Sequence, residues 1–120
     1  MLRLVNLISA TIIALGLSTG IASAEPSKES FIKASYYSSG QRTANGERFN
    51  PNGFTAASRT LPFGTMLHVT NPATGRSVIV RINDRGPFVR GRDLDLARGA
   101  AVALGMIARG TANLKVSRLN

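Results

Sequence analysis

One carboxyl group in this sequence stands in a setting that suits acid–base chemistry. Asp84 lies between Arg81 and Arg85 at the end of an apolar run, and the chain turns sharply after it at Gly86-Pro87. An acid at the end of a strand has an anchored backbone and a side chain that can reach a groove, where it can donate or accept a proton. The two arginines stabilise the carboxylate and oppose its action as an acid, whereas burial would counter them. The alternative is that Asp84 only organises the turn.

A second carboxyl group and a serine lie upstream in two polar segments. Glu47 is part of the run 43–49, and Ser58 is part of the run 55–64. Glu47 is either a partner of Asp84 or a solvated loop acid. Ser58 can form hydrogen bonds but carries no charge at neutral pH. Because His68 is the only histidine and the chain has no cysteine, we expect neither a serine nucleophile nor a metal site.

The elements that must position these residues are mostly strands. A β-rich run predicts a strand over 31–37, and a polar loop with two turn signals follows over 41–52. Residues 66–70 and 76–82 predict a hairpin, which places Asp84 just beyond its second strand. The alternation within that strand predicts that its core-facing side chains are Val78, Val80 and Ile82.

The remaining segments predict one helix and one further strand. Residues 54–59 predict a short helical turn, whereas 95–104 predict a full helix that Asp95 caps and Gly105 ends. Residues 111–119 predict the last strand, with Leu114 and Val116 on one face. The predicted fold class is therefore mostly β, a small closed β-barrel with one short inserted helix.

Aromatic side chains offer a surface for sugars or for packing. Tyr36 and Tyr37 are neighbours on a predicted strand and must point to opposite sides, so at most one faces a groove. We expect that residue to be Tyr37; the alternative is that both pack in the barrel. The chain has no tryptophan, and we expect its core to include Phe49, Phe63 and Phe88.

The beginning of the chain has the pattern of a secretory signal. Arg3 precedes an apolar stretch, and Ala22-Ser23-Ala24 forms a small-residue cleavage site. We expect residues 1–24 to be a signal peptide, 25–30 a flexible lead-in and 31–120 one barrel domain. Without a cysteine for lipid attachment, we expect an exported protein of the periplasm or the extracellular space that has no stable membrane anchor.

Basic residues outnumber acidic ones, with a formal net charge of +9 at pH 7. Cleavage after Ala24 would leave +8, since Arg3 is the only charged residue removed. Such a surface favours polyanions, which in the envelope include peptidoglycan carboxylates, teichoic acids and lipid phosphates. The export signal and the scattering of the basic residues argue against nucleic acid as a partner.

Three segments in order resemble one known family. They are 43–49 (Thr-Ala-Asn-Gly-Glu-Arg-Phe), 55–64 (Thr-Ala-Ala-Ser-Arg-Thr-Leu-Pro-Phe-Gly) and 81–88 (Arg-Ile-Asn-Asp-Arg-Gly-Pro-Phe). Together they resemble the rare lipoprotein A-like proteins, double-psi β-barrels of the bacterial envelope, over roughly 34–120. Some members are lytic transglycosylases. The resemblance implies cleavage of the MurNAc–GlcNAc bond of peptidoglycan glycan strands, giving 1,6-anhydro-muramic products without a cofactor or metal.

The resemblance also implies roles for individual residues. Asp84 would act as acid and base in turn, because the muramic 6-hydroxyl of the substrate replaces water as the nucleophile. Glu47 would assist by orienting Asp84, by raising its pKa or by stabilising an oxocarbenium-like state. The implied substrate-binding residues are Tyr37, Ser58, Arg59, Arg81 and Arg85. Ser58 departs from catalytic relatives, which often have histidine there.

Two further interpretations remain open at the level of sequence. The same barrel can serve as a non-catalytic, expansin-like module that binds cell-wall glycan, or as an inhibitor that interacts through its basic face. The small size, the missing tryptophan and Ser58 favour the binding module, whereas the presence of Glu47 and Asp84 favours the enzyme. In each case we expect a monomer.

Overall fold

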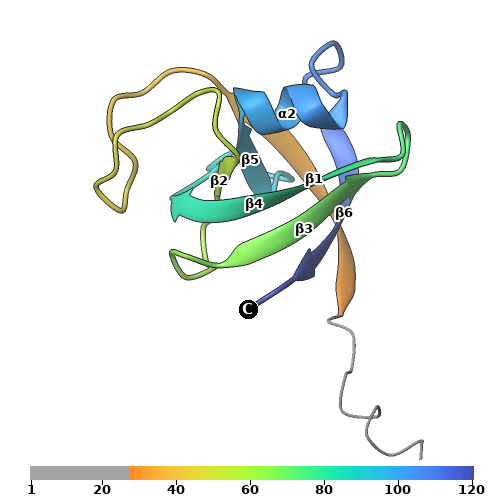
Figure 1. Ribbon diagram of the computed structural model, residues 1–120, viewed down its shortest axis with the longest axis horizontal. Coiled ribbons are helices and arrows are strands. Elements are labelled where there is room, and N and C mark those ends of the chain that lie inside the picture. Colours follow the sequence, from red (N-terminus) through yellow and green to blue (C-terminus); the bar gives the residue numbers. More distant parts are fainter. Residues whose placement is uncertain (1–27) are drawn as a thin grey trace, which may run out of the picture.

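A computed structural model describes residues 28–120 as a β-barrel with one helix (Figure 1). The expected signal peptide and residues 25–27 of the expected lead-in lie outside these residues. The elements in chain order are β1 (Glu29–Tyr37), β2 (Thr55–Ala57), β3 (Met66–Asn71), β4 (Arg76–Asp84), β5 (Leu94–Ala97), α2 (Arg98–Leu104) and β6 (Ala112–Arg118). Strand β1 begins before the expected domain start at Phe31, because Glu29 and Ser30 pair with Ser117 and Val116.

The strands close into a barrel in the order β1-β5-β2-β4-β3-β6. Two pairs are parallel, β1 with β5 and β2 with β4, and the other pairs are antiparallel. A closed barrel leaves no sheet edge unpaired, which suits a small domain without disulfides. The predicted fold class is thus confirmed, with one short helix among residues 28–120.

Alternating apolar side chains fill the barrel. In the predicted hairpin Val69 lies opposite Val78 and Leu67 opposite Val80, while the intervening His68 is exposed. Val80 and Ile82 are fully buried, and Val78 packs against the same cluster, as their alternation predicted. The other predicted alternation is also confirmed, since Leu114 and Val116 of β6 are both buried.

Two predicted helical segments are strands. Residues 55–57, expected in a helical turn, form β2, and 95–97, expected to begin the helix, belong to β5. In β5 Leu94 and Leu96 both point into the core, and a spacing of two residues is possible only in a strand. The backbone of β5 bonds β1 on one side and β2 on the other, so tertiary pairing overrides the helical pattern.

The helix α2 packs on β1, β4 and β5 and is tied to the β3–β4 hairpin (Figure 1). Its buried face consists of Ala100, Ala101 and Leu104. Gly105 ends it in the left-handed conformation, as predicted. The amide of Asn71 and the hydroxyl of Thr74 both donate to the Leu104 carbonyl, at 2.8 and 3.0 Å. The hairpin loop therefore caps the free end of the helix.

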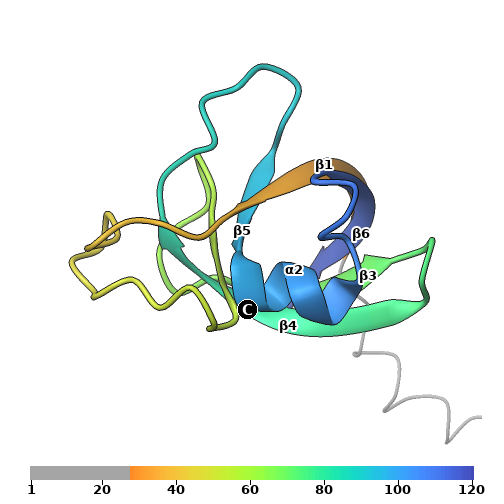
Figure 2. The ribbon, with the colours of Figure 1, turned by 90° about the horizontal axis from the view of Figure 1, so that it is seen from above.

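Two long connections, 38–54 and 85–93, project from the barrel (Figure 2). The 38–54 connection follows β1, and the 85–93 connection follows β4. Within residues 28–120, no helix has the length and apolar character needed to cross a membrane.

Candidate functional site

A β-bulge at the end of β4 aims Asp84 outward. Strand β4 runs parallel to β2, with Ile82 opposite Ala56, but the next β2 residue, Ala57, lies opposite Asp84 and not Asn83. Strict alternation would turn Asp84 to the same side as the buried Ile82. The extra residue shifts this alternation, so that Asp84 joins Ala57 in lining an open pocket. Asp84 is the last residue of β4, because the strand continues past the expected end at residue 82.

Three donors hold the carboxylate of Asp84. Its Oδ1 accepts hydrogen bonds from the backbone N–H groups of Ala44, at 2.8 Å, and Arg85, at 2.9 Å. Its Oδ2 accepts one from the Tyr37 hydroxyl at 2.8 Å. The donors come from both long connections and from β1, so the carboxylate joins three parts of the chain. Since every neighbour donates, both oxygens of the Asp84 carboxylate act as acceptors in this arrangement.

Tyr37 lies at the pocket, as expected, and Tyr36 packs against the core cluster. The Tyr37 ring stacks on Phe49, with centroids 4.6 Å apart. Partial burial, followed by the hydrogen bond to Asp84 and its negative charge, raises the pKa of Tyr37 well above its usual range. Tyr37 therefore remains a hydroxyl donor to Asp84 at any working pH.

The pocket has a volume of about 360 Å³. Strands β1, β2, β4 and β5 and the 85–93 connection supply its lining, which includes Ser35, Tyr37, Ala57, Asp84, Phe88, Arg92 and Asp95. Phe88, Arg92 and Asp95 were not among the expected site residues. Asp95 was expected to cap a helix and Phe88 to lie in the core. The alternation of Leu94 and Leu96 was the signal that could have placed Asp95 on a strand face.

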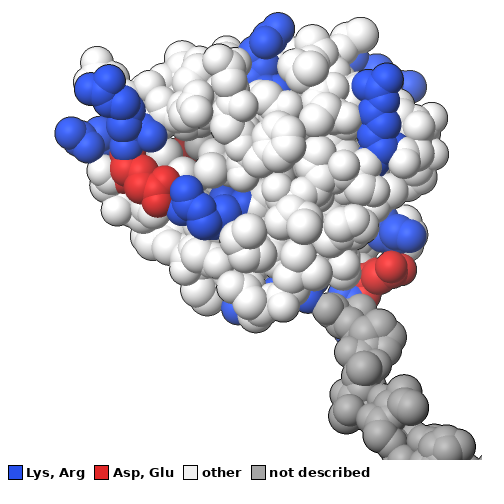
Figure 3. Space-filling view, viewed as in Figure 1, with Lys and Arg blue, Asp and Glu red and all other residues white. Residues whose placement is uncertain are grey.

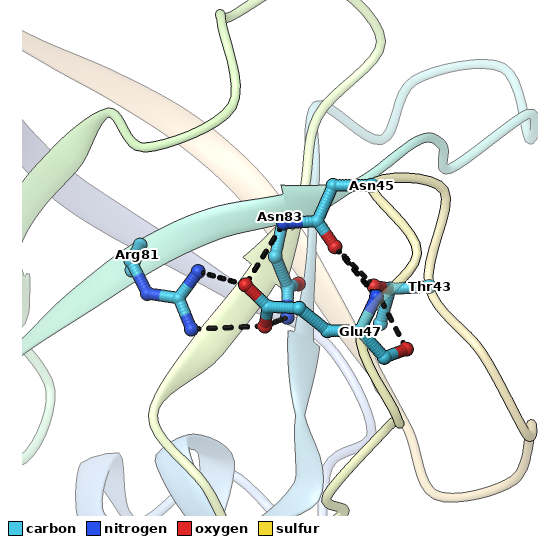
Figure 4. Close-up of polar contacts among 5 residues, drawn as sticks. All are labelled: Thr43, Asn45, Glu47, Arg81 and Asn83. Carbon is cyan, nitrogen blue, oxygen red and sulfur yellow. Dashed lines mark hydrogen bonds and ion pairs between the residues drawn. The ribbon is translucent and has the colours of Figure 1, made fainter.

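Glu47 lies in a separate cluster that fastens the 38–54 connection to β4 (Figure 4). Its carboxylate accepts two hydrogen bonds from the Arg81 guanidinium, at 2.7 and 3.0 Å, and one from the Asn83 amide at 3.1 Å. The Asn45 amide donates a further bond at 2.9 Å. Thr43 completes the cluster through its hydroxyl, 2.6 Å from Asn45 Oδ1. Glu47 is not among the residues that line the Asp84 pocket.

These contacts keep Glu47 ionised at neutral pH. Hydrogen bonds from Arg81 first, then Asn83 and Asn45, lower its pKa to about 2. The cluster also sets the position of the Ala44 N–H, because the adjacent Asn45 N–H donates to the Asn83 carbonyl at 3.2 Å. Glu47 therefore acts on Asp84 indirectly, by holding the loop whose Ala44 N–H donates to the Asp84 carboxylate.

The expected substrate-binding arginines already have protein partners. Arg81 pairs with Glu47. One nitrogen of Arg85 donates to the Ser58 and Leu61 carbonyls, at 2.9 Å each, and its guanidinium lies 4.0 Å above the Phe63 ring.

Arg59 joins the two sides of the site. Its Nη1 donates to the carbonyls of Pro87, at 2.7 Å, and Arg92, at 2.6 Å, and its Nη2 lies 3.7 Å from Asp93. It therefore holds the 85–93 connection in place. Arg92 lines the pocket, and its charge interacts with Asp95.

Ser58 is buried and lies outside the Asp84 pocket. Its hydroxyl oxygen accepts hydrogen bonds from the Thr60 and Leu61 N–H groups, at 3.3 and 3.0 Å. Ser58 thus organises the turn whose Ser58 and Leu61 carbonyls accept hydrogen bonds from Arg85.

The expected core phenylalanines divide. Phe49 is buried, but Phe63 and Phe88 are 41% and 81% exposed, so their assignment to the core was wrong. Phe63 precedes Gly64 and Phe88 follows Pro87, so both lie in loops outside the strands. Their side chains therefore stay exposed. Residues 28–120 contain no cluster of three or more histidine or acidic side chains able to hold a metal ion.

Comparison with known proteins identifies relatives of the whole barrel. A family model described as lytic transglycolase matches residues 30–116. The probable endolytic peptidoglycan transglycosylase RlpA of Nostoc sp. is 61% identical over 80 residues, which are 67% of this chain and 22% of that protein. The endolytic peptidoglycan transglycosylase RlpA of Campylobacter jejuni is 53% identical over 77 residues, 64% of this chain and 28% of that protein. The chain thus spans about a quarter of the length of these relatives.

Solved structures share the fold at low sequence identity. The expansin of Clavibacter michiganensis aligns with a TM-score of 0.65 and 23% identity, over 78% of this chain and 51% of that one. The Streptomyces papain inhibitor aligns with the same TM-score and 19% identity, over 79% and 97%. An expansin and a protease inhibitor therefore share this barrel, and the role of this chain must be argued from its site.

Proposed function

This chain is a member of the lytic transglycolase family of double-psi β-barrels, and on that premise we propose that it cleaves the glycan strands of peptidoglycan. The observation that carries the proposal is the carboxylate of Asp84, which three donors hold at the wall of an open pocket. A residue that served only the turn would not need a strand bulge and a tyrosine from β1 to aim it outward. The names of the relatives, all peptidoglycan transglycosylases, support the same substrate.

The proposed reaction is an intramolecular transfer. The muramic 6-hydroxyl attacks C1 of its own sugar, the bond from C1 to the linking oxygen breaks, and a 1,6-anhydro ring forms without water. The attacking hydroxyl must lose a proton, and the leaving oxygen must gain one. With both oxygens accepting hydrogen bonds, Asp84 is better suited to receive the hydroxyl proton than to deliver one, which revises the expectation that it plays both parts.

Glu47 then acts as a positioning residue. Its cluster with Arg81, Asn83 and Asn45 fastens the loop whose Ala44 N–H donates to Asp84. Ser58, Arg59 and Arg85 hold the surrounding connections through the contacts described above. We assign these residues to support of the pocket, and we assign direct contact with substrate to Tyr37 and two residues that the sequence analysis missed.

Those two residues are Phe88 and Arg92. Phe88 lines the pocket and is 81% exposed, so its ring offers an apolar face on which a sugar can stack. Arg92 lines the same pocket and can meet the lactyl carboxylate of a muramic acid. We propose that the protein acts as an exported monomer in the envelope, where this substrate lies, without a cofactor, nucleic acid or stable membrane anchor.

The test is digestion of purified sacculi in water enriched in oxygen-18, followed by mass analysis of the released fragments. Intramolecular transfer gives anhydro-muropeptides that lack the heavy oxygen, whereas a hydrolase gives reducing ends that contain it. Binding to sacculi without release of fragments would contradict the proposal and support the expansin-like binding module. A heavy-oxygen reducing end would keep glycan cleavage but contradict the transglycosylase mechanism.

A further inference from the structure

The Asp84 pocket contains a second carboxyl group, that of Asp95. Strand β2 lies between β4 and β5, and its residue Ala57 is the register partner of both acids. The two acids therefore flank one alanine, and their Cα atoms are separated by two strand spacings, about 10 Å. The methyl group of Ala57 leaves the space between them open, so a glycosidic linkage can lie between the two carboxyl groups.

The surroundings of Asp95 differ from those of Asp84. Asp95 is partly buried, and its one hydrogen bond comes from the Ser35 hydroxyl at 2.9 Å. Two charged groups act on Asp95: Arg92, which precedes β5, and Asp84 on β4. The charge of Asp95 in turn contributes to the raised pKa of Tyr37 on β1. Burial first raises the pKa of Asp95, the charge of Asp84 adds to this, and Ser35 and Arg92 oppose it.

We propose that Asp95 is the proton donor to the leaving oxygen, and that Asp84 is the base that receives the proton of the attacking hydroxyl. The inference rests on the proposed function and divides its acid–base work between two residues. The Asp84 carboxylate accepts three hydrogen bonds, whereas Asp95 accepts one, from the Ser35 hydroxyl. Two carboxyl groups with such different partners in one pocket can divide into a base and an acid.

The proton and electron balance of this step is complete. The Asp95 carboxyl gives its proton to the linking oxygen, which leaves as a hydroxyl with the electron pair of the broken bond to C1. The 6-hydroxyl oxygen forms the new bond to C1, and its proton passes to Asp84. Transfer of one proton from Asp84 to Asp95 through solvent restores both groups, so no water, oxidant or other reactant is consumed.

The experiment compares two substrates that differ in their need for an acid. Sacculi have a sugar leaving group, which requires protonation. A dinitrophenyl β-glycoside of GlcNAc–MurNAc has a leaving group that departs without a proton. We expect Asp95→Asn to lose about 10²- to 10⁴-fold in activity on sacculi and to stay within about tenfold of wild type on the aryl glycoside. Asp84→Asn should lose activity on both substrates. Glu29→Gln removes a carboxylate from β1 near the other end of the barrel, where it pairs with Lys115, and serves as the control.

The outcomes separate this inference from the proposed function. An Asp95→Asn protein as active on sacculi as wild type would overturn the inference alone, and so would equal losses on both substrates by a variant that melts like wild type. A wild-type protein that cleaves neither substrate would contradict the proposed function and the inference together.

A second variant tests the inference if Asp95→Asn fails to fold. Ser35→Ala removes the hydroxyl whose hydrogen bond lowers the pKa of Asp95, so that pKa rises further. Because the donor must be protonated, the loss of kcat/KM at high pH should then occur at a higher pH than in wild type. Ser30→Ala, on the same strand but outside the pocket, is the matched control. An unshifted high-pH limb in active Ser35→Ala protein would overturn the assignment.

Discussion

Glu47 and Asp84 differ in what their oxygens contact. Glu47 accepts hydrogen bonds from Arg81, Asn83 and Asn45, all within the contact between the 38–54 connection and β4. Asp84 accepts two backbone N–H bonds and a tyrosine hydroxyl beside open space. A carboxylate occupied by an arginine is poorly placed for proton transfer, whereas one beside a pocket is accessible to a substrate. Under the proposed function, the ion pair of Glu47 therefore supports the site, and the pocket-lining Asp84 takes part in the chemistry.

Replacement of Glu47 by glutamine should lower the melting temperature at neutral pH. Its pKa is lowered to about 2 from an ordinary value of 4.5, so the unfolded chain takes up this proton at a higher pH than the folded chain. The stabilisation is fully present above pH 4.5 and is lost as the pH falls toward 2. Thermal unfolding across this range should show the difference from wild type shrinking as the pH falls. A constant difference, or none at pH 7, would contradict this role, and Glu29→Gln is the control.

Arg92→Gln should weaken binding of glycan strands that lack stem peptides. Its guanidinium lines the pocket, and substitution leaves its backbone carbonyl free to accept the Arg59 bond. A partly exposed charge pair is worth up to about 1 kcal/mol, so the affinity should fall about two- to fivefold. Arg90→Gln, an exposed neighbour outside the pocket, should bind like wild type. Equal affinities for Arg92→Gln and Arg90→Gln in a titration would contradict the assignment.

The sequence was sufficient to predict that Asp84 and Tyr37 lie at a groove, because both lie on or beside strands with clear alternation. It did not predict that the expected arginines are held by carbonyls and by Glu47, since those partners lie in distant loops. Asp95 was missed because its strand also fits a helical pattern, with Leu96, Ala97, Ala100 and Leu104 at helical spacing.

At the level of elements, β2 decides where the site lies. This strand contains only Thr55–Ala57, yet it bonds β4 on one side and β5 on the other. Its small residues allow β4 and β5, which contain Asp84 and Asp95, to lie on either side of it. The register shift beside Ala57 turns Asp84 toward the pocket. A strand of three residues carries too little pattern to be recognised in a sequence, which is why it was taken for a helical turn. The long hairpin and the last strand were predicted because their alternation extends over more residues.

Gly99→Ala should destabilise the protein although alanine favours helices. A Cβ atom at Gly99 would lie 2.4 Å from the Asn52 carbonyl oxygen, and the Gly99 N–H donates to the Pro51 carbonyl at 2.7 Å. Alanine gains about 1 kcal/mol in helix propensity. Relief of a backbone clash costs about 1–3 kcal/mol, so the free energy of unfolding should fall on balance. Denaturant unfolding measures this, with Val102→Ala on the exposed face of α2 as the control. An unchanged or more stable Gly99→Ala protein would show that the 38–54 connection does not press on α2.

At the scale of the whole molecule, the positive charge is spread over the surface. Figure 3 shows Lys and Arg side chains at separate places on one face, with acidic groups beside some of them. Several of the expected cationic contacts are internal, including the pair between Arg81 and Glu47. Under the proposed function, the net charge of +9 acts mainly as a long-range attraction to an anionic wall, while recognition depends on the pocket.

Binding to sacculi should therefore weaken as salt increases, while cleavage of a short soluble glycan should change much less. The screening length falls from about 8 Å at 0.15 M to about 3 Å at 1 M salt, which removes attraction between exposed charges but leaves contacts within the pocket. Pull-down with sacculi and turnover of the soluble substrate can be measured over the same salt series. Pull-down that is unaffected by salt would contradict a role for the overall charge.

The most direct test of the account compares wild type with Asp84→Asn for release of anhydro-muropeptides from sacculi. Asparagine can still accept the Ala44 and Arg85 N–H bonds through its oxygen, and its amide can donate to the Tyr37 hydroxyl, so the fold and the binding of glycan should persist. The amide cannot take up the proton, and we expect activity to fall about 10²- to 10⁴-fold with the melting temperature and sacculus binding retained. A folded Asp84→Asn protein that releases these products at the wild-type rate would contradict the account.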